Sequence, residues 1–206
     1  TMEKIGSFLH KANAQIDIAM YNIDVTDQNP VIQAIKASNM QSKLKNGTLE
    51  IRFIYEGFEE EEEEIVKKLE ELENIGIDVK RLKSGLKMHH KFSVIDGYSE
   101  NPSLVTGSAN WSMFSYRNYN ENILYFTGKP EIAKIFQREF ELLWDNSEEF
   151  GKKQSNVKPV ELKIKEQEEI KPYFNSANFK VSESGSFHKI IPLKWTLTKS
   201  IVGLIS

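Results

Sequence analysis

Hydrophobic and polar residues form two alternating kinds of pattern along the first 145 positions of the chain. Apolar residues three and four positions apart predict amphipathic helices at 2–12, 59–74 and 130–145. A further helix is predicted between Asn29-Pro30 and Asn46-Gly47, because proline favours a first helical turn and Asn-Gly ends helices. Short β-prone runs predict strands at 15–21, 49–55, 88–95, 103–106 and 119–127, and a further strand that begins with 76–79.

This order of elements predicts the fold class and the domain organisation. Helices that alternate with strands usually pack on a sheet that is at least partly parallel. We therefore predict an α/β domain with a mixed central β-sheet at 1–148, a linker at 149–169 and a β-prone extension at 170–206. Because Lys199–Ile205 faintly repeats Lys4–Leu9, the alternative is that the extension starts a second, truncated repeat.

Composition narrows the class of protein. With 39% hydrophobic and 28% charged residues, the 206-residue chain has the make-up of a soluble globular protein. It contains no cysteine, which excludes disulfides, thiolate metal sites and a cysteine nucleophile. No apolar run reaches the roughly 18 residues of a membrane helix. We expect a cytoplasmic protein, with a leader upstream of Thr1-Met2 as the open alternative.

The charges are unevenly distributed. The formal net charge is −3, but six of the thirty acidic residues form one run, Glu59–Glu64, which we predict to be a solvated helix face. Without these six charges the balance would be +3. Cations gather ahead of residue 92, at Lys80, Arg81, Lys83, Lys87 and Lys91. Such a local positive field can steer an anionic substrate even when the net charge is negative.

The run Met88-His89-His90-Lys91 is the strongest candidate for chemistry. On a strand, residues two apart share a face, so His89 and Lys91 point to one side and His90 to the other. A neutral imidazole is a competent nucleophile toward phosphorus, and a neighbouring lysine stabilises negative charge on phosphate oxygens. We therefore predict His89 as the nucleophile and His90 as a supporting residue.

A second group of polar residues follows this run. Ser108 and Asn110 lie in a predicted turn, where their hydroxyl and amide groups can bind the same phosphate. Glu121 is a candidate for holding one histidine nitrogen in the right tautomer. We predict that Trp111 packs beneath the turn rather than stacking on a base.

These residues resemble the signature of the phospholipase D superfamily, H-x-K-x4-D followed by G-S-x-N. The matching residues are His89, Lys91, Asp96, Gly107, Ser108 and Asn110. The similarity covers about residues 1–146 and is greatest to the single-motif, nuclease-like branch. Ten residues separate Asp96 from Gly107, more than the family usually has. Such an insertion adds little loop entropy but can alter access to the site.

The resemblance implies a phospholipase D-like fold, in which helices sandwich a mixed β-sheet. It implies phosphodiester cleavage through a covalent phosphohistidine, with no metal or other cofactor. Two copies of the motif then complete one active site, because one histidine attacks while the other protonates the leaving oxygen.

The resemblance also implies a role for each site residue. The catalytic residues would be His89, Lys91, Asn110 and Glu121. The residues that bind the substrate phosphate would be Lys91, Ser108 and Asn110. Asp96 and Gly107 would be structural.

Three functions are compatible with these features. The preferred one is a nuclease that acts on DNA or RNA, either as a homodimer or as half of a longer two-motif protein. The second is a phospholipase or phosphatidyltransferase of the same superfamily, against which the lack of a membrane-length run and the presence of Trp111 weigh. The third is a non-catalytic half of a larger two-motif protein.

Overall fold

The computed structural model describes residues 2–44, 47, 49–56, 63–82 and 88–162. The predicted extension at 170–206 and the end of the predicted linker lie outside the described residues, so the domain boundaries stay predictions. Most of the acidic run, Glu59–Glu62, also lies outside them. All the candidate site residues named above are described.

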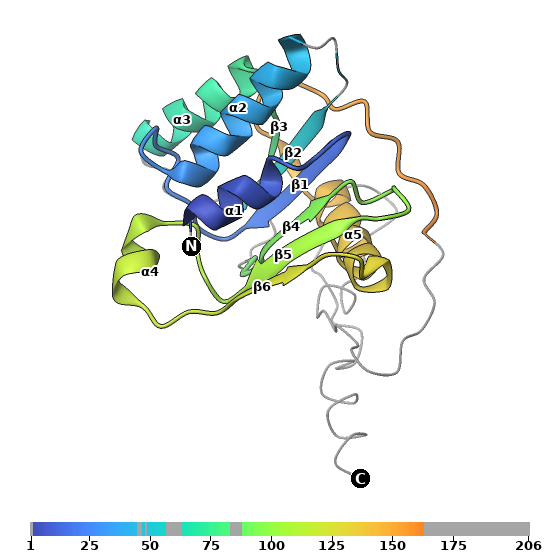
Figure 1. Ribbon diagram of the computed structural model, residues 1–206. Coiled ribbons are helices and arrows are strands. Elements are labelled where there is room, and N and C mark those ends of the chain that lie inside the picture. The colour runs from blue at the N-terminus through green and yellow to red at the C-terminus, as the bar shows by residue number, and fades with distance from the viewer. Residues whose placement is uncertain (1, 45–46, 48, 57–62, 83–87, 163–206) are drawn as a thin grey trace, which may run out of the picture. The chain divides into compact units, whose positions relative to one another are not determined.

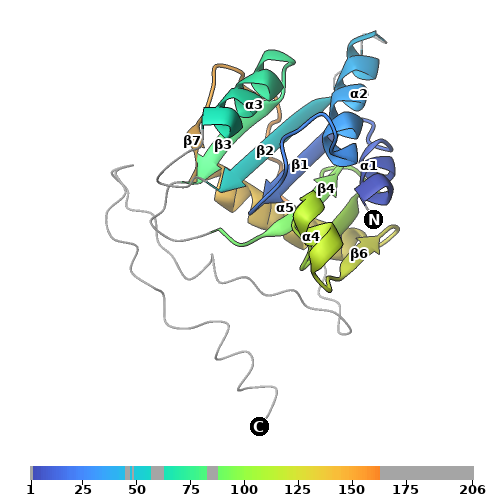
Figure 2. The same cartoon turned by 90° about the vertical axis from the view of Figure 1, so that its left-hand side faces the viewer.

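A seven-stranded mixed sheet forms the centre of the described fold, which confirms the predicted α/β class. Its strands are β1 (Gln15–Met20), β2 (Glu50–Glu56), β3 (Asp78–Leu82), β4 (Lys91–Ile95), β5 (Ser103–Gly107), β6 (Ile123–Phe126) and β7 (Glu148–Glu149). Their spatial order is β6-β5-β4-β1-β2-β3-β7 (Figures 1 and 2). The pairs among β1, β2 and β3 are parallel and all the others are antiparallel. The central strand β1 therefore has a parallel neighbour on one side and an antiparallel one on the other.

Helices cover both faces of this sheet, as the sandwich arrangement requires. On one face lie α1 (Met2–Leu9), α2 (Pro30–Leu44) and α3 (Glu63–Asn74), and on the other lies α5 (Pro130–Asp145) (Figures 1 and 2). The short helix α4 (Met113–Asn118), between β5 and β6, projects away from the sheet. Among the described residues, none of the helices is long and apolar enough to cross a membrane.

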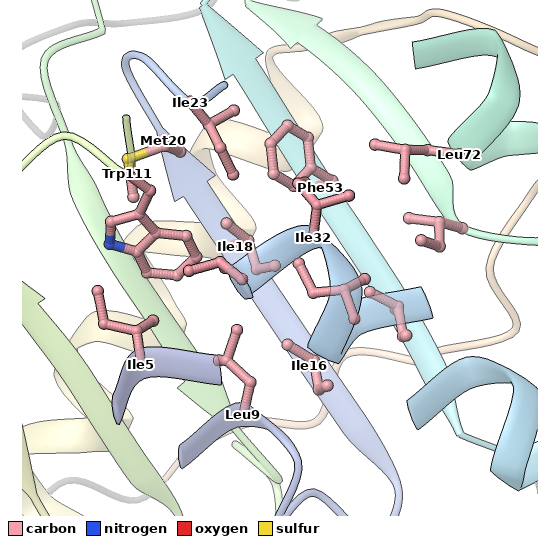
Figure 3. Packing of buried hydrophobic residues seen from close by; sticks show 14 of the residues in the cluster. Ile5, Leu9, Ile16, Ile18, Met20, Ile23, Ile32, Phe53, Leu72 and Trp111 are labelled. Atoms are coloured by element: carbon pink, nitrogen blue, oxygen red, sulfur yellow. The ribbon is translucent and has the colours of Figure 1, made fainter. Parts of the chain in front are cut away.

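The larger hydrophobic core lies between the sheet and helices α1 to α3. Ile5 and Leu9 of α1 face Ile18 of β1, and all three side chains are buried (Figure 3). Trp111 enters this core from the loop after β5 and is only 2% exposed, which confirms that it packs beneath the turn. Its backbone also bridges to that of Ile23, so the loops after β5 and β1 are fixed to each other.

The second core lies on the opposite face, beneath α5. Phe92 of β4 contacts Phe136 of α5 in an edge-to-face arrangement, with ring centroids 5.1 Å apart. The buried stripe of α5 repeats at helical spacing and consists of Ile132, Ala133, Phe140, Leu143 and Trp144. This stripe holds α5 across the strands that carry the candidate site.

Several elements differ from the sequence predictions. The strand predicted at 88–95 begins at Lys91, so both histidines precede β4 instead of lying within it. The strand predicted to begin at Gly76 begins at Asp78, because Gly76, with a φ of 96°, still belongs to the turn that ends α3. The sequence pattern does not predict α4 or β7, since such short elements carry too little periodicity.

The chain after α5 is held against the edge of the sheet. The backbone N–H of Phe150 donates to the Val79 carbonyl at 3.0 Å, and that of Ser155 donates to the Asp78 carboxylate at 2.5 Å. The Asp78 side chain is buried, and its Oδ1 atom has no hydrogen-bond partner among the described residues. Burial is the main cause that raises the pKa of Asp78 to about 6, and the nearby Glu149 adds to the effect.

We expect Asp78→Asn to stabilise the fold near neutral pH and to have little effect in acid. The folded carboxyl titrates at about 6 and an unfolded one at about 4, so the native state keeps a proton that the unfolded state releases between these values. Wild-type stability therefore falls as the pH rises through this window, by about 1–3 kcal/mol. Thermal melts of both proteins at about pH 4.5 and 7.5 measure the difference. A gain that does not grow with pH would contradict this assignment.

Candidate active site

The candidate residues collect at one end of the central sheet. The register pairs Met20, the last residue of β1, with Lys91, the first residue of β4. Thr106 pairs with Phe92, so the end of β5 lies beside the start of β4. Gly107 in turn pairs with the first residue of β6. Antiparallel pairing therefore brings both parts of the motif together, although they are separate in the sequence.

His89 and Lys91 are in direct contact. The Lys91 Nζ atom lies 3.3 Å from Nδ1 and 3.2 Å from Nε2 of His89, and it donates a hydrogen bond to the His89 carbonyl at 3.0 Å. Lys91 is buried whereas His89 is exposed. Burial lowers the pKa of the Lys91 ammonium, and the negative charge of Glu121 partly offsets this effect. The pair thus consists of an accessible imidazole beside a fixed cation.

Tyr21 is a third member of this group, and sequence reasoning missed it. Its ring centroid lies 4.6 Å from that of His89, and the Lys91 Nζ atom lies 4.9 Å from the same centroid. Its backbone N–H donates to the His90 carbonyl at 2.8 Å. Because an aromatic face attracts a cation by about 0.5–2 kcal/mol, the ring favours the charged form of Lys91. The available signal was the place of Tyr21 at the C-terminal end of the predicted strand 15–21, beside which the site forms.

Two substitutions of Tyr21 distinguish the contribution of its ring from that of its hydroxyl group. Tyr21→Phe keeps the aromatic face and is expected to retain most of the activity. Tyr21→Leu removes the face, and we expect about a tenfold lower kcat and an alkaline limb of the pH–rate profile displaced to lower pH. The shift follows because Lys91 loses an interaction that favours its ammonium form. Equal losses in the two variants, with unshifted profiles, would mean that the ring does not act on Lys91.

His90 points away from this group, as strand parity predicts. Its Nε2 atom lies 3.0 Å from Oε1 of Glu139 on α5, and the Glu139 side chain is only 4% exposed. The backbone N–H of Met88 donates to the Glu56 carboxylate at 2.6 Å. Contacts on both sides of His89 therefore anchor the segment that carries it.

Ser108 and Glu121 form the second half of the cluster. The Ser108 hydroxyl donates to Oε2 of Glu121, and Oε1 of the same carboxylate accepts from Ser115 at 3.2 Å. The Ser108 oxygen also accepts from the backbone and side-chain N–H groups of Asn122, at 3.0 and 3.1 Å. Glu121 thus contacts hydroxyl groups, and its role in orienting a histidine stays a prediction.

Gly107 and Asn110 shape the turn around Ser108. Gly107 has a φ of 155°, and a Cβ atom at this position would collide with the Asn122 carbonyl oxygen. A side chain here would therefore displace the Asn122 contact with Ser108. The Oδ1 atom of Asn110 is buried and has no hydrogen-bond partner among the described residues. The folded chain thus leaves part of this carboxamide's hydrogen-bonding capacity unused.

Asp96 is the motif residue that lies away from the site. It follows the last residue of β4, at the opposite end of a five-residue strand from Lys91. Its carboxylate accepts hydrogen bonds from the backbone N–H groups of Asn13, Ala14 and Gln15, at 2.8 to 3.2 Å. Asp96 therefore fixes the start of β1 and acts on the site only through the sheet.

Comparison with known sequences identifies related proteins. A family model described as cardiolipin synthase, PLD-like domain, matches residues 5–144. A mitochondrial cardiolipin hydrolase of Xenopus laevis is 40% identical over 74 residues, which are 36% of this chain and 33% of that protein. One of Chlamydomonas reinhardtii is 26% identical over 145 residues, which are 70% of this chain and 58% of that protein. The chain thus matches between 33% and 58% of the length of these relatives.

Two solved structures are similar to this fold. The phospholipase D family member Nuc from Salmonella typhimurium has a TM-score of 0.58 at 16% identity, over 71% of this chain and 88% of that one. The polyphosphate kinase from Porphyromonas gingivalis has a TM-score of 0.57 at 21% identity, over 72% of this chain and 25% of that one. At such identities the likeness concerns the fold alone.

Proposed function

Since the chain belongs to the phospholipase D-like family, we propose that it is a phosphodiesterase with His89 as its nucleophile. The observation that carries this proposal is the contact of the exposed His89 with the buried cation of Lys91. Both residues lie at the sheet end to which β5 and β6 bring Ser108 and Glu121. This end of the sheet can therefore supply a nucleophile together with groups that bind a phosphate.

In the proposed reaction, a ring nitrogen of His89 attacks phosphorus. An N–P bond forms while the bond between phosphorus and the leaving oxygen breaks, and that oxygen takes a proton from an acid. Lys91 and Asn110 bind the non-bridging oxygens, on which negative charge accumulates, and Ser108 joins them by turning its hydroxyl group from Glu121 to the phosphate. Water then attacks phosphorus, the N–P bond breaks, and the group that served as acid accepts a proton from the water.

A second copy of the motif is proposed to supply this acid. The sequence contains a single His-x-Lys run, and the neighbouring His90 is paired with Glu139 on the far side of the strand. The second histidine would then come from a homodimer partner or from another motif-bearing half. In either case Glu121 would lie near the arriving imidazole and could orient it.

The proposed substrate is the phosphodiester of a phospholipid, with cardiolipin as the first candidate. The names of the relatives, mitochondrial cardiolipin hydrolases, support this substrate over the DNA or RNA expected from the sequence. Hydrolysis of one of its two diesters would yield phosphatidic acid and phosphatidylglycerol. Nucleic acids contain the same reacting group, so a direct comparison of substrates has to decide.

The test is a substrate panel in excess EDTA. The purified chain is incubated with cardiolipin vesicles, phosphatidylcholine vesicles, a single-stranded oligonucleotide and the soluble diester bis(p-nitrophenyl) phosphate, while light scattering reports its oligomeric state. We expect phosphatidic acid from cardiolipin and release of nitrophenol, both unaffected by EDTA. Cleavage of the oligonucleotide without lipid cleavage would replace the lipid proposal. A dimer that cleaves none of the four would refute the phosphodiesterase proposal.

A further inference from the structure

Exposed apolar surface is concentrated in the segment that follows the Ser108 turn. Of the six large hydrophobic side chains exposed in the described ranges, four lie between residues 114 and 124. They are Phe114 at 62%, Tyr116 at 50%, Tyr119 at 56% and Leu124 at 51% exposure. The rings of Phe114 and Tyr119 meet edge to face, with centroids 5.5 Å apart. We call Phe114 and Tyr119 the α4 aromatic patch; Tyr116, two positions from Phe114, lies on another side of the helix.

The helix that carries this patch is firmly attached to the fold. Ser112 caps α4 by accepting a hydrogen bond from the backbone N–H of Ser115 at 3.2 Å. The backbone N–H of Met113 donates to the Asp24 carboxylate at 2.6 Å. The Ser115 hydroxyl bonds to Glu121, the same carboxylate that holds Ser108. A surface that binds α4 would therefore have a fixed position relative to the half of the active site that this chain supplies. We call this group, His89, Lys91, Ser108 and Glu121, the half-site.

We propose that the α4 aromatic patch docks on an anionic phospholipid bilayer and holds the half-site at the headgroups. The inference rests on the proposed phospholipid substrate, whose phosphate lies in such an interface. Tyrosine is favoured at membrane interfaces because its ring is apolar and its hydroxyl stays hydrated. Arg117, exposed on the same helix, adds a cation for anionic headgroups. The nearby acid Glu121 is already bonded to Ser108 and Ser115.

The size of the patch favours a bilayer over a second copy of the chain. Two aromatic side chains of about 150–250 Å² each, both somewhat more than half exposed, offer roughly 240 Å². A stable protein interface needs about 800 Å² from each partner. Shallow insertion into a bilayer needs far less apolar area, because attraction to anionic lipid adds to it.

The double variant Phe114→Ser/Tyr119→Ser tests the proposal in the full chain. We expect flotation with vesicles of phosphatidylcholine and cardiolipin, and hydrolysis of their lipid, to fall at least about tenfold. Hydrolysis of soluble bis(p-nitrophenyl) phosphate should be unchanged, because neither residue belongs to the reacting group. Met40→Ser removes a side chain of equal exposure, 62%, from α2 and serves as the matched control.

Three outcomes would overturn the proposal. The first is unchanged flotation of the double variant. The second is an equal loss on the soluble diester, which would mean that α4 shapes the reacting site. The third is that light scattering finds a dimer for the wild type and a monomer for the double variant. The patch would then contact a second copy of the chain. If the wild type hydrolyses no diester, the proposed function fails, whereas flotation still decides whether the patch binds the bilayer.

Discussion

His89→Ala is expected to lower the rate of phosphodiester hydrolysis by at least about a thousandfold. The variant loses the atom that forms the covalent bond to phosphorus, whereas Lys91 and Ser108 can still bind the phosphate. Because His89 is exposed, its truncation leaves no buried cavity and the melting temperature should change little. Values of kcat/KM on cardiolipin vesicles and on the soluble diester, with melting curves of both proteins, measure the two effects.

His90→Ala is the matched control, since it removes an identical side chain from the adjacent position. His90 contacts Glu139 on the far face, so we expect a loss of about tenfold or less, through weaker anchoring of the segment. Similar losses in the two variants would contradict the assignment of His89 as nucleophile. Wild-type protein quenched in alkali during turnover of the soluble diester should show the added mass of a nitrophenylphosphoryl group, because the N–P bond to histidine persists in alkali, and His89→Ala should not.

Local patterns account for the parts of the fold that the sequence predicts. The helix expected at 130–145 is α5, with the same bounds, because its apolar stripe and Pro130 both act within the segment. The helix expected after Asn29-Pro30 is α2, which begins at Pro30 for the same kind of reason. Strand parity correctly separates His89 from His90 although both precede β4, and the Tyr21 N–H still bonds to the His90 carbonyl beside the start of the strand.

Contacts between distant segments account for what the sequence does not predict. Tyr21 meets His89 and Lys91 only because β4 pairs with β1, and no local pattern specifies that pairing. The same pairing sends Asp96 to the far end of the sheet, although it is a motif residue. Spacing along one chain segment thus yields a candidate nucleophile, but not every residue around it.

The choice of substrate also depends on surfaces that form only when distant segments come together. The phosphate group that Lys91, Ser108 and Asn110 are predicted to bind is common to lipids and nucleic acids. The sequence-based preference for a nucleic acid rested on resemblance to one branch of the family and stays a prediction. Surroundings such as the α4 aromatic patch differ in what they can bind, and they become visible only in the folded chain.

Behind the site, α5 is joined to the sheet by a buried ion network around Arg52. The guanidinium contacts Asp17 at 2.7 and 2.8 Å and Glu141 of α5 at 2.6 and 3.1 Å. Arg52 is 1% exposed and Asp17 is fully buried. Burial alone would lower the pKa of Arg52, but the two carboxylates more than offset this and raise it. The same helix supplies Glu139 to His90, so this network supports the segment that carries His89.

Arg52→Met is expected to destabilise the fold by about 3–5 kcal/mol, because it leaves the Asp17 carboxylate buried without its cation. For a chain of this size the melting temperature should fall by about 6–20 °C. The loss should be greater at alkaline than at acidic pH. An unpaired buried carboxyl keeps its proton more strongly in the folded than in the unfolded state, so stability falls as the pH rises.

The double variant Asp17→Asn/Arg52→Met distinguishes charge from packing. With both charges removed, the carboxamide introduced at position 17 can still accept a hydrogen bond from Gln137, and Glu141 retains some access to solvent. We expect the double variant to regain more than half of the stability lost in Arg52→Met, and its melting temperature to depend on pH no more than that of the wild type. Arg52 also lies 4.7 and 5.2 Å from the ring centroids of Phe140 and Trp144. A double variant no more stable than the single one would mean that this aromatic packing, and not charge neutralisation, holds α5 behind the site.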